Sequence, residues 1–306
     1  MNLRPKSARS APPPAQERPI AAADSVTWRR GLFAFPRLAT TWKLHWILRI
    51  AVGLEFIGHG VFGIMGKAAW LAYYDVLGIP ASIGWDLMPW VGGMDIALGL
   101  LVLIRPMRAP IAFMAFWGLF TASLRPLAGE GIWEFVERSY NFGVPLALLL
   151  LHGVGTSLRH WLARITTVRR LRRSASEFAW GLRAIIGSYL VGHGGLGLFT
   201  DKPLLIEHYD SIGLTALVGD PHTLNEVIGL FEIALGVLVF AWPATGMLVF
   251  VLAWKLSTEL LHVTAGAYGA GWEVIERASA YAAPLALICV TSLLRTGIVA
   301  PIARPR

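Results

Sequence analysis

The stretch LRIAVGLEFIGHGVFG, from Leu48 to Gly63, recurs later in the chain as LRAIIGSYLVGHGGLG, from Leu182 to Gly197. Both copies keep the Leu-Arg pair and the whole Gly-His-Gly triplet, and each lies inside a longer apolar run. A helix needs about 20 apolar residues to cross a bilayer core of about 30 Å, at 1.5 Å per residue. The stretch therefore predicts membrane-crossing helices in a duplicated chain.

Composition extends this prediction to the whole chain. Of its 306 residues, 55% are hydrophobic and only 15% are charged, whereas soluble domains carry about 25% charged residues. Apolar runs lie near 44–65, 88–105, 110–128, 141–156, 180–199, 224–242, 244–264 and 280–297. We therefore expect an all-α integral membrane protein with eight transmembrane helices.

Basic residues predict the orientation of these helices. They concentrate in the first 43 residues, in the central segment 157–179 and in the short loop before Arg108. The positive-inside rule places such segments in the cytoplasm, so both termini are expected there, with the protein in the inner membrane. The basic segment 1–43 has no continuous apolar core and is expected to be a disordered tail, not a signal peptide. The net charge of +8 therefore comes from segments expected to lie at the cytoplasmic surface of the lipid bilayer. We expect no nucleic-acid partner.

The two halves of the chain match beyond the opening stretch. Asp95 aligns with Glu232, Trp117 with Trp254, and the box WEFVER (133–138) with WEVIER (272–277). Four spans per half is an even number, so both halves enter and leave on the same side as parallel repeats. We expect two four-helix bundles, 44–156 and 180–297, packed side by side, with 157–179 as a cytoplasmic linker and 298–306 as a second tail.

This combination of motifs resembles a known family. Leu-Arg, Gly-His-Gly with a following lysine (Lys67, Lys202), an acidic small-residue helix and a Trp-Glu box before the fourth helix are similar to the DoxX/DoxD-like four-helix membrane proteins. The resemblance covers nearly all of both repeats. It implies a tandem fusion of two such units and an association with quinone-linked membrane redox complexes.

Several ionisable residues interrupt the apolar runs. A charge at mid-bilayer costs at least about 2.5–3.5 kcal/mol, so these groups are expected to face the bundle interior and pair with one another. Lys255, Glu259 and His262 are spaced to share one helical face. The candidate ligand-binding residues are His59, His193, Glu55, Glu134, Glu137, Glu273, Glu276, Asp95, Glu232, Lys255, Glu259 and His262.

The halves also differ at three aligned positions. Glu55, Gly118 and Ala122 in the first half align with Tyr189, Lys255 and Glu259 in the second. A site built from both halves is therefore expected to be asymmetric, with Glu55 and His59 on one side and Lys255, Glu259 and His262 on the other.

The two boxes, 133–138 and 272–277, predict ion pairs and an outer polar lid over the histidine of each bundle. Glu134 and Arg138 are four residues apart, as are Glu273 and Arg277, so each pair is expected to form a salt bridge. The depth of each box places Glu134 and Glu137 beside His59. By the same argument, Glu273 and Glu276 belong beside His193. We thus expect each histidine to be held by a glutamate of its own bundle.

Three roles fit His59 and His193. They form hydrogen bonds across a close helix contact, they transfer protons or bind a quinone, or they ligate a haem as an axial pair, for which no further signature is present. A single cysteine, Cys289, excludes a disulfide framework, and no metal motif is found.

Two aromatic segments and the basic surface leave the function open. WLAYYDVLGIP (70–80) and LLIEHYDSIGL (204–214) are expected to form short helices at the outer headgroup level, as an anchor or a gate for a lipid-soluble ligand. The resemblance favours a quinone-interacting or accessory subunit of a membrane oxidoreductase system. The alternatives are a transporter or permease, and a non-catalytic scaffold that recruits a soluble partner at its basic cytoplasmic face.

Overall fold

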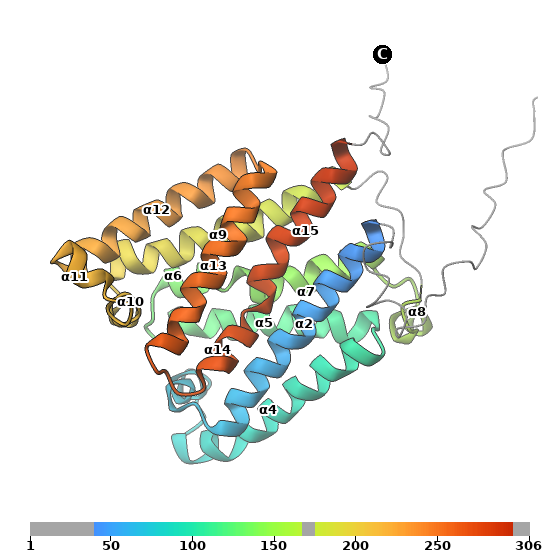
Figure 1. The fold of residues 1–306 in the computed structure, drawn as a ribbon. Coiled ribbons are helices and arrows are strands. Elements are labelled where there is room, and N and C mark those ends of the chain that lie inside the picture. Colours follow the sequence, from blue (N-terminus) through green and yellow to red (C-terminus); the bar gives the residue numbers. More distant parts are fainter. Residues whose placement is uncertain (1–39, 167–174, 296–306) are drawn as a thin grey trace, which may run out of the picture. The chain divides into compact units, whose positions relative to one another are not determined.

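A computed structural model describes residues 40–166 and 175–295, which are all α (Figure 1). These residues contain no β-strand, only an isolated bridge between Met107 and Arg164. The helices of the first half are α2 (Thr40–Met65), the 3-10 helix η2 (Ala68–Trp70), α3 (Leu71–Val76), α4 (Ala81–Ile104), α5 (Arg108–Leu127), α6 (Ile132–Glu137), α7 (Ser139–His152) and α8 (Leu158–Leu162). Those of the second half are α9 (Ala175–Thr200), α10 (Pro203–Asp210), α11 (Leu214–Val218), α12 (Pro221–Ala241), α13 (Thr245–Thr264), α14 (Ala270–Glu276) and α15 (Ala278–Arg295).

Five described segments are long and apolar enough to cross a membrane: α2, α4, α12, α13 and the segment Ala270–Arg295, which combines α14 and α15. Their length and hydropathy indicate a multi-pass membrane protein. Helices α5, α7 and α9 occupy the three other predicted spans but do not meet this criterion. The 14 residues of α7 cover only about 21 Å, less than a bilayer core of about 30 Å.

Some predicted boundaries are wrong. Helix α2 begins at Thr40 and α9 at Ala175, inside the expected tail 1–43 and linker 157–179. That linker also holds α8. A helix extends past its apolar run whenever the flanking residues tolerate helical geometry, so an apolar run underestimates helix length. The predictions for 1–39, for 167–174 and for the tail 298–306 lie outside the described residues.

Glycines bring the long helices into close pairs. Helix α2 packs against α4, and α9 packs against α12. A Cβ added at Gly60 would lie 2.5 Å from the carbonyl oxygen of Gly92, and one added at Gly229 would lie 2.5 Å from that of Gly194. No side chain larger than hydrogen fits at these crossings, so the glycines fix how near the helices lie.

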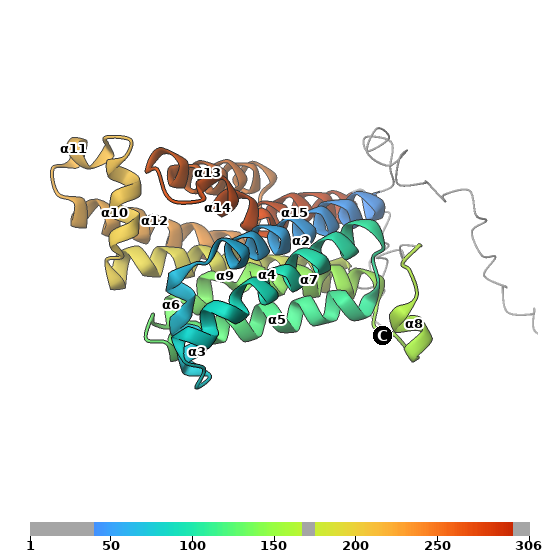
Figure 2. The ribbon, with the colours of Figure 1, turned by 90° about the horizontal axis from the view of Figure 1, so that it is seen from below.

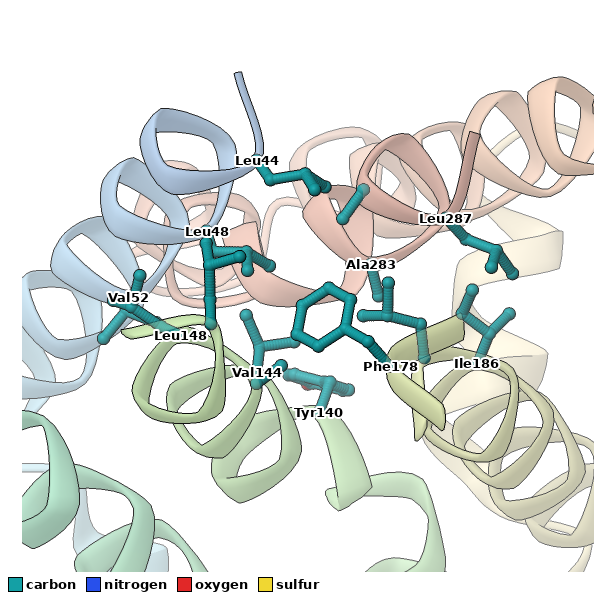
Figure 3. Close-up of a cluster of buried hydrophobic side chains, with 14 of the residues drawn as sticks. Leu44, Leu48, Val52, Tyr140, Val144, Leu148, Phe178, Ile186, Ala283 and Leu287 are labelled. Atoms are coloured by element: carbon teal, nitrogen blue, oxygen red, sulfur yellow. The ribbon is translucent and has the colours of Figure 1, made fainter. Parts of the chain in front are cut away.

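The largest hydrophobic core is shared by the two halves. It is built around α2, α7, α9 and α15, with Leu48, Val144, Ile186 and Leu287 among its members (Figure 3). Two of these helices come from each half of the sequence. The halves are therefore joined by a common core.

The two short box helices pack across the halves. Helix α6, from the first half, lies against α9, and α14, from the second, lies against α2 (Figure 2). A Cβ on Gly58 would lie 2.6 Å from the backbone nitrogen of Glu276, and a Cβ on Gly192 would lie under 3.0 Å from the backbone of Glu137. The first glycine of each Gly-His-Gly triplet thus makes room for the glutamate box of the other half.

Candidate functional site

The histidine of each triplet lies between two close backbone contacts and is paired with a carboxylate. His59 Nδ1 is 3.6 Å from Glu276 Oε2, and His193 Nδ1 is hydrogen-bonded to Glu232. A histidine held by a glutamate is as expected, but the partners differ from the prediction. Glu276 comes from the other half, and Glu232 comes from α12 and not from a box. The placement of each box beside the histidine of its own bundle is therefore wrong.

Two ion pairs also join each half to the box of the other half. Lys67 Nζ lies 2.7 Å from Glu273 Oε1, and Lys202 pairs with Glu134. Each lysine follows the Gly-His-Gly helix of one half and binds the box of the other. Because a buried carboxylate without its partner is destabilised by about 3–5 kcal/mol, these pairs hold the exchanged boxes in place.

Only one of the two expected intrahelical box pairs forms. Arg277 Nη1 is 2.6 Å from Glu273 Oε2, which confirms that prediction. Glu134 instead contacts Arg125 at 3.0 Å, while Arg138 Nε lies 3.9 Å from Glu137. Arg125 comes from α5, and spacing along α6 carries no information about it.

The predicted cluster on α13 is confirmed. Lys255 Nζ is 2.9 Å from Glu259 Oε1, and His262 Nε2 is 3.5 Å from Glu259 Oε2. Arg277 Nε lies 2.7 Å from the same Oε2. Because Arg277 also contacts Glu276 at 2.9 Å, and Glu276 lies 3.6 Å from His59, the α13 cluster is linked to His59 by a continuous series of polar contacts.

A cavity of about 120 Å³ lies among α2, α3, α4 and α5. Aromatic rings supply much of its wall: Phe56, Trp70, Tyr73, Tyr74, Trp117 and Phe120. The ring of His59 stacks on Trp70 with centroids 6.0 Å apart. The aromatic segment 70–80 thus contributes side chains to a cavity as well as forming the short helices that we expected.

Polar groups line the same cavity. Glu55, Asp95 and Asn141 are buried there, and each has an oxygen without a hydrogen-bond partner among the described residues. Tyr73, in α3, donates a hydrogen bond to Glu130. Burial raises the pKa of the Tyr73 hydroxyl despite the opposing effect of nearby Arg125, so this hydroxyl stays protonated.

Arg138 also lines a second pocket, of about 20 Å³. It is lined by ionisable side chains that include His193, Lys202, Glu259 and His262. The ring of His208, in α10, is 4.3 Å from that of His262. Burial, and then the neighbouring His262, lower the pKa of His208 to about 4. His208 is therefore neutral at physiological pH.

The candidate residues thus separate into two groups. Glu55, His59 and Asp95 line the larger cavity, whereas Glu137, His193, Glu259 and His262 line the smaller one. Asn141 and Arg125 were not predicted as cavity residues, because nothing in their spacing marks them. Trp117 was noted only as the match of Trp254. Among the residues that the structure describes, no group of three or more His, Cys, Asp or Glu side chains can hold a metal ion.

Searches of protein-family models, of curated proteins and of solved structures found no match to this chain.

Proposed function

We propose that the chain is a tandem pair of DoxX-like four-helix units with eight spans, in the inner membrane, with both termini in the cytoplasm. The matched glycine crossings, Gly60 with Gly92 and Gly194 with Gly229, support the repeat. Helices at all eight predicted positions support the number of spans. Reporter fusions test the topology: a fusion after Asp220 is expected outside and one after Ser174 inside. An inside result at Asp220 would exclude parallel repeats.

We further propose that the cavity among α2, α3, α4 and α5 binds the head of a quinone, on behalf of a membrane oxidoreductase system. The observation that carries this proposal is an aromatic cavity with hydrogen-bonding groups among membrane-embedded helices. A dry protein cavity of about 150 Å³ binds benzene, so about 120 Å³ suits a single six-membered ring. Aromatic walls favour a flat ring, and buried polar groups orient it.

The crossed packing makes quinone binding a better proposal than transport by rocking. Parallel-repeat transporters move one half against the other around a central site. Here α6 and α14 each pack on a helix of the other half, and Leu48, Val144, Ile186 and Leu287 share one core. Such motion would break these contacts.

Filling the cavity tests the proposed function. Ala122 is buried in the cavity wall, so Ala122→Leu should occupy the space of the ring. Ala97→Leu makes the same change at an exposed position of α4 and serves as the matched control. Decylubiquinone should quench the tryptophan fluorescence of the purified wild-type protein and the control with similar affinities. We expect at least tenfold weaker binding to Ala122→Leu. Equal binding to all three proteins would reject this cavity as the quinone site.

A further inference from the structure

Three buried oxygen atoms at the cavity have no hydrogen-bond partner among the described residues: Glu55 Oε2, Asp95 Oδ1 and Asn141 Oδ1. The three side chains are 2%, 4% and 6% exposed and come from α2, α4 and α7. All three line the cavity. Buried acceptors normally receive a hydrogen bond, so three bare ones around one space indicate a missing donor.

Most donors of the cavity wall are already engaged. Arg125 is held by Glu130 at 2.7 Å and by Glu134 at 3.0 Å. The Tyr73 hydroxyl donates to Glu130, and His59 Nδ1 lies 3.6 Å from Glu276 Oε2, within ion-pair distance but beyond hydrogen-bond distance. Arg138 Nε lines the cavity without a hydrogen-bond partner among the described residues and lies 3.9 Å from Glu137. An occupant that donates hydrogen bonds would satisfy the three oxygens.

The second half carries its own donors at the matching place. Glu232, which aligns with Asp95, accepts hydrogen bonds from His193 and from Trp254 Nε1, the latter at 2.7 Å. Lys255 replaces Gly118, and its ammonium group is buried, 2.9 Å from Glu259 and 6.0 Å from the centre of the Tyr189 ring. In the first half the aligned residues are Gly118 and Ala122, which supply neither the ammonium nor its carboxylate. The first half thus lacks the ammonium group of Lys255. Trp117, which aligns with Trp254, is within hydrogen-bonding reach of Asp95, but Asp95 Oδ1 still has no partner among the described residues.

We propose that the cavity binds the reduced hydroquinone in preference to the quinone, with the two ring hydroxyls donating to Glu55 Oε2 and Asp95 Oδ1. This inference rests on the proposed function. A quinone presents two carbonyl acceptors and would place acceptor against acceptor, whereas a hydroquinone presents two donors. Asn141 can turn its amide to either form and contributes no discrimination.

Anaerobic titration of the purified full-length protein tests this preference. The probes are decylubiquinol and decylubiquinone, followed by tryptophan fluorescence. We expect the reduced form to bind at least tenfold more tightly, which raises the midpoint potential of the bound two-electron couple by about 30 mV. Asp95→Asn and Glu55→Gln should each reduce the preference, because an amide can donate to a quinone carbonyl. Asp86→Asn makes the same kind of change at an exposed position of α4. It is the control and should leave the preference unchanged.

Each result separates this inference from the function it rests on. If neither form binds, the proposed function fails. If both forms bind equally, or the quinone binds more tightly, the carboxyl groups act as donors and the hydroquinone preference is overturned while the quinone site stands. A preference that survives both Asp95→Asn and Glu55→Gln would overturn the assignment to these two groups. The two variants are made separately, so a loss of folding in one leaves the other as the test.

Discussion

Replacing Gly192 by alanine should loosen the contact between α9 and α6. The added Cβ would lie under 3.0 Å from the backbone nitrogen and Cα of Glu137. Backbone atoms cannot turn aside as a flexible side chain can, so α6 must move away from α9. Overpacking of this kind costs about 1–3 kcal/mol, and the higher helix propensity of alanine returns about 1 kcal/mol. We expect a net loss of about 1 kcal/mol.

Gly181→Ala on the same helix is the matched control. Its added Cβ meets nothing within 4 Å, so this variant should gain up to about 1 kcal/mol from helix propensity. The two variants should then differ by about 2 kcal/mol in the free energy of unfolding. At about 2–4 °C per kcal/mol, the Tm in detergent should differ by about 4–8 °C.

The reciprocal variant Gly58→Ala, beside Glu276, should lose stability in the same way. Intrinsic tryptophan fluorescence during heating measures all three variants. If Gly192→Ala and Gly58→Ala are as stable as Gly181→Ala, the box helices do not rest on the helices of the other half, and the crossed packing is refuted.

Two further experiments examine the exchange and the second pocket. The first uses double-cysteine variants in a Cys289→Ser background. A short thiol cross-linker should join Lys67→Cys to Glu273→Cys, because the native side chains lie 2.7 Å apart, and it should not join Lys67→Cys to Glu134→Cys. The reverse result would show that each box packs on its own half. Because the pKa of His208 is lowered to about 4, the unfolded chain takes up a proton near pH 6.5 before the folded chain does. The resulting loss of stability is absent above about pH 6.5 and grows as the pH falls toward 4. The Tm should therefore fall more between pH 7.5 and pH 5 in the wild type than in His208→Gln, and an equal fall would show that His208 does not contribute.

The sequence predicted an all-α protein with several helices long and apolar enough to cross a membrane, because the length of an apolar run is a direct signal for such a helix. It also predicted contacts between residues three and four positions apart, such as Lys255 with Glu259 and Arg277 with Glu273. Helical geometry alone brings such side chains together. Helix ends were less accurate, because Thr40–Lys43 and Ala175–Ala179 are helical without being part of a long apolar run.

The partners of the boxes could not be predicted from the same information. Spacing along a helix shows which side chains share a face, but not which neighbouring helix that face meets. The two Gly-His-Gly motifs are nearly identical, and so are the two boxes, so each box fits either motif equally well by sequence. The choice depends on the path of the chain around the shared core, as the pairing of Glu276 with His59 shows.

The differences between the halves are more informative than their similarities. In the proposed repeat, matching residues lie in similar surroundings, so a difference in side-chain volume at a matched position must be compensated or must leave space. Lys255 and Glu259 fill their places in the second half and neutralise each other at 2.9 Å. Gly118 and Ala122 leave the matching space open, and both line the cavity. Glu55, where the second half has Tyr189, adds a carboxyl group to that space. A smaller side-chain volume, the absence of an internal cation and an additional acid thus coincide in one half, around the cavity that we propose as the quinone site.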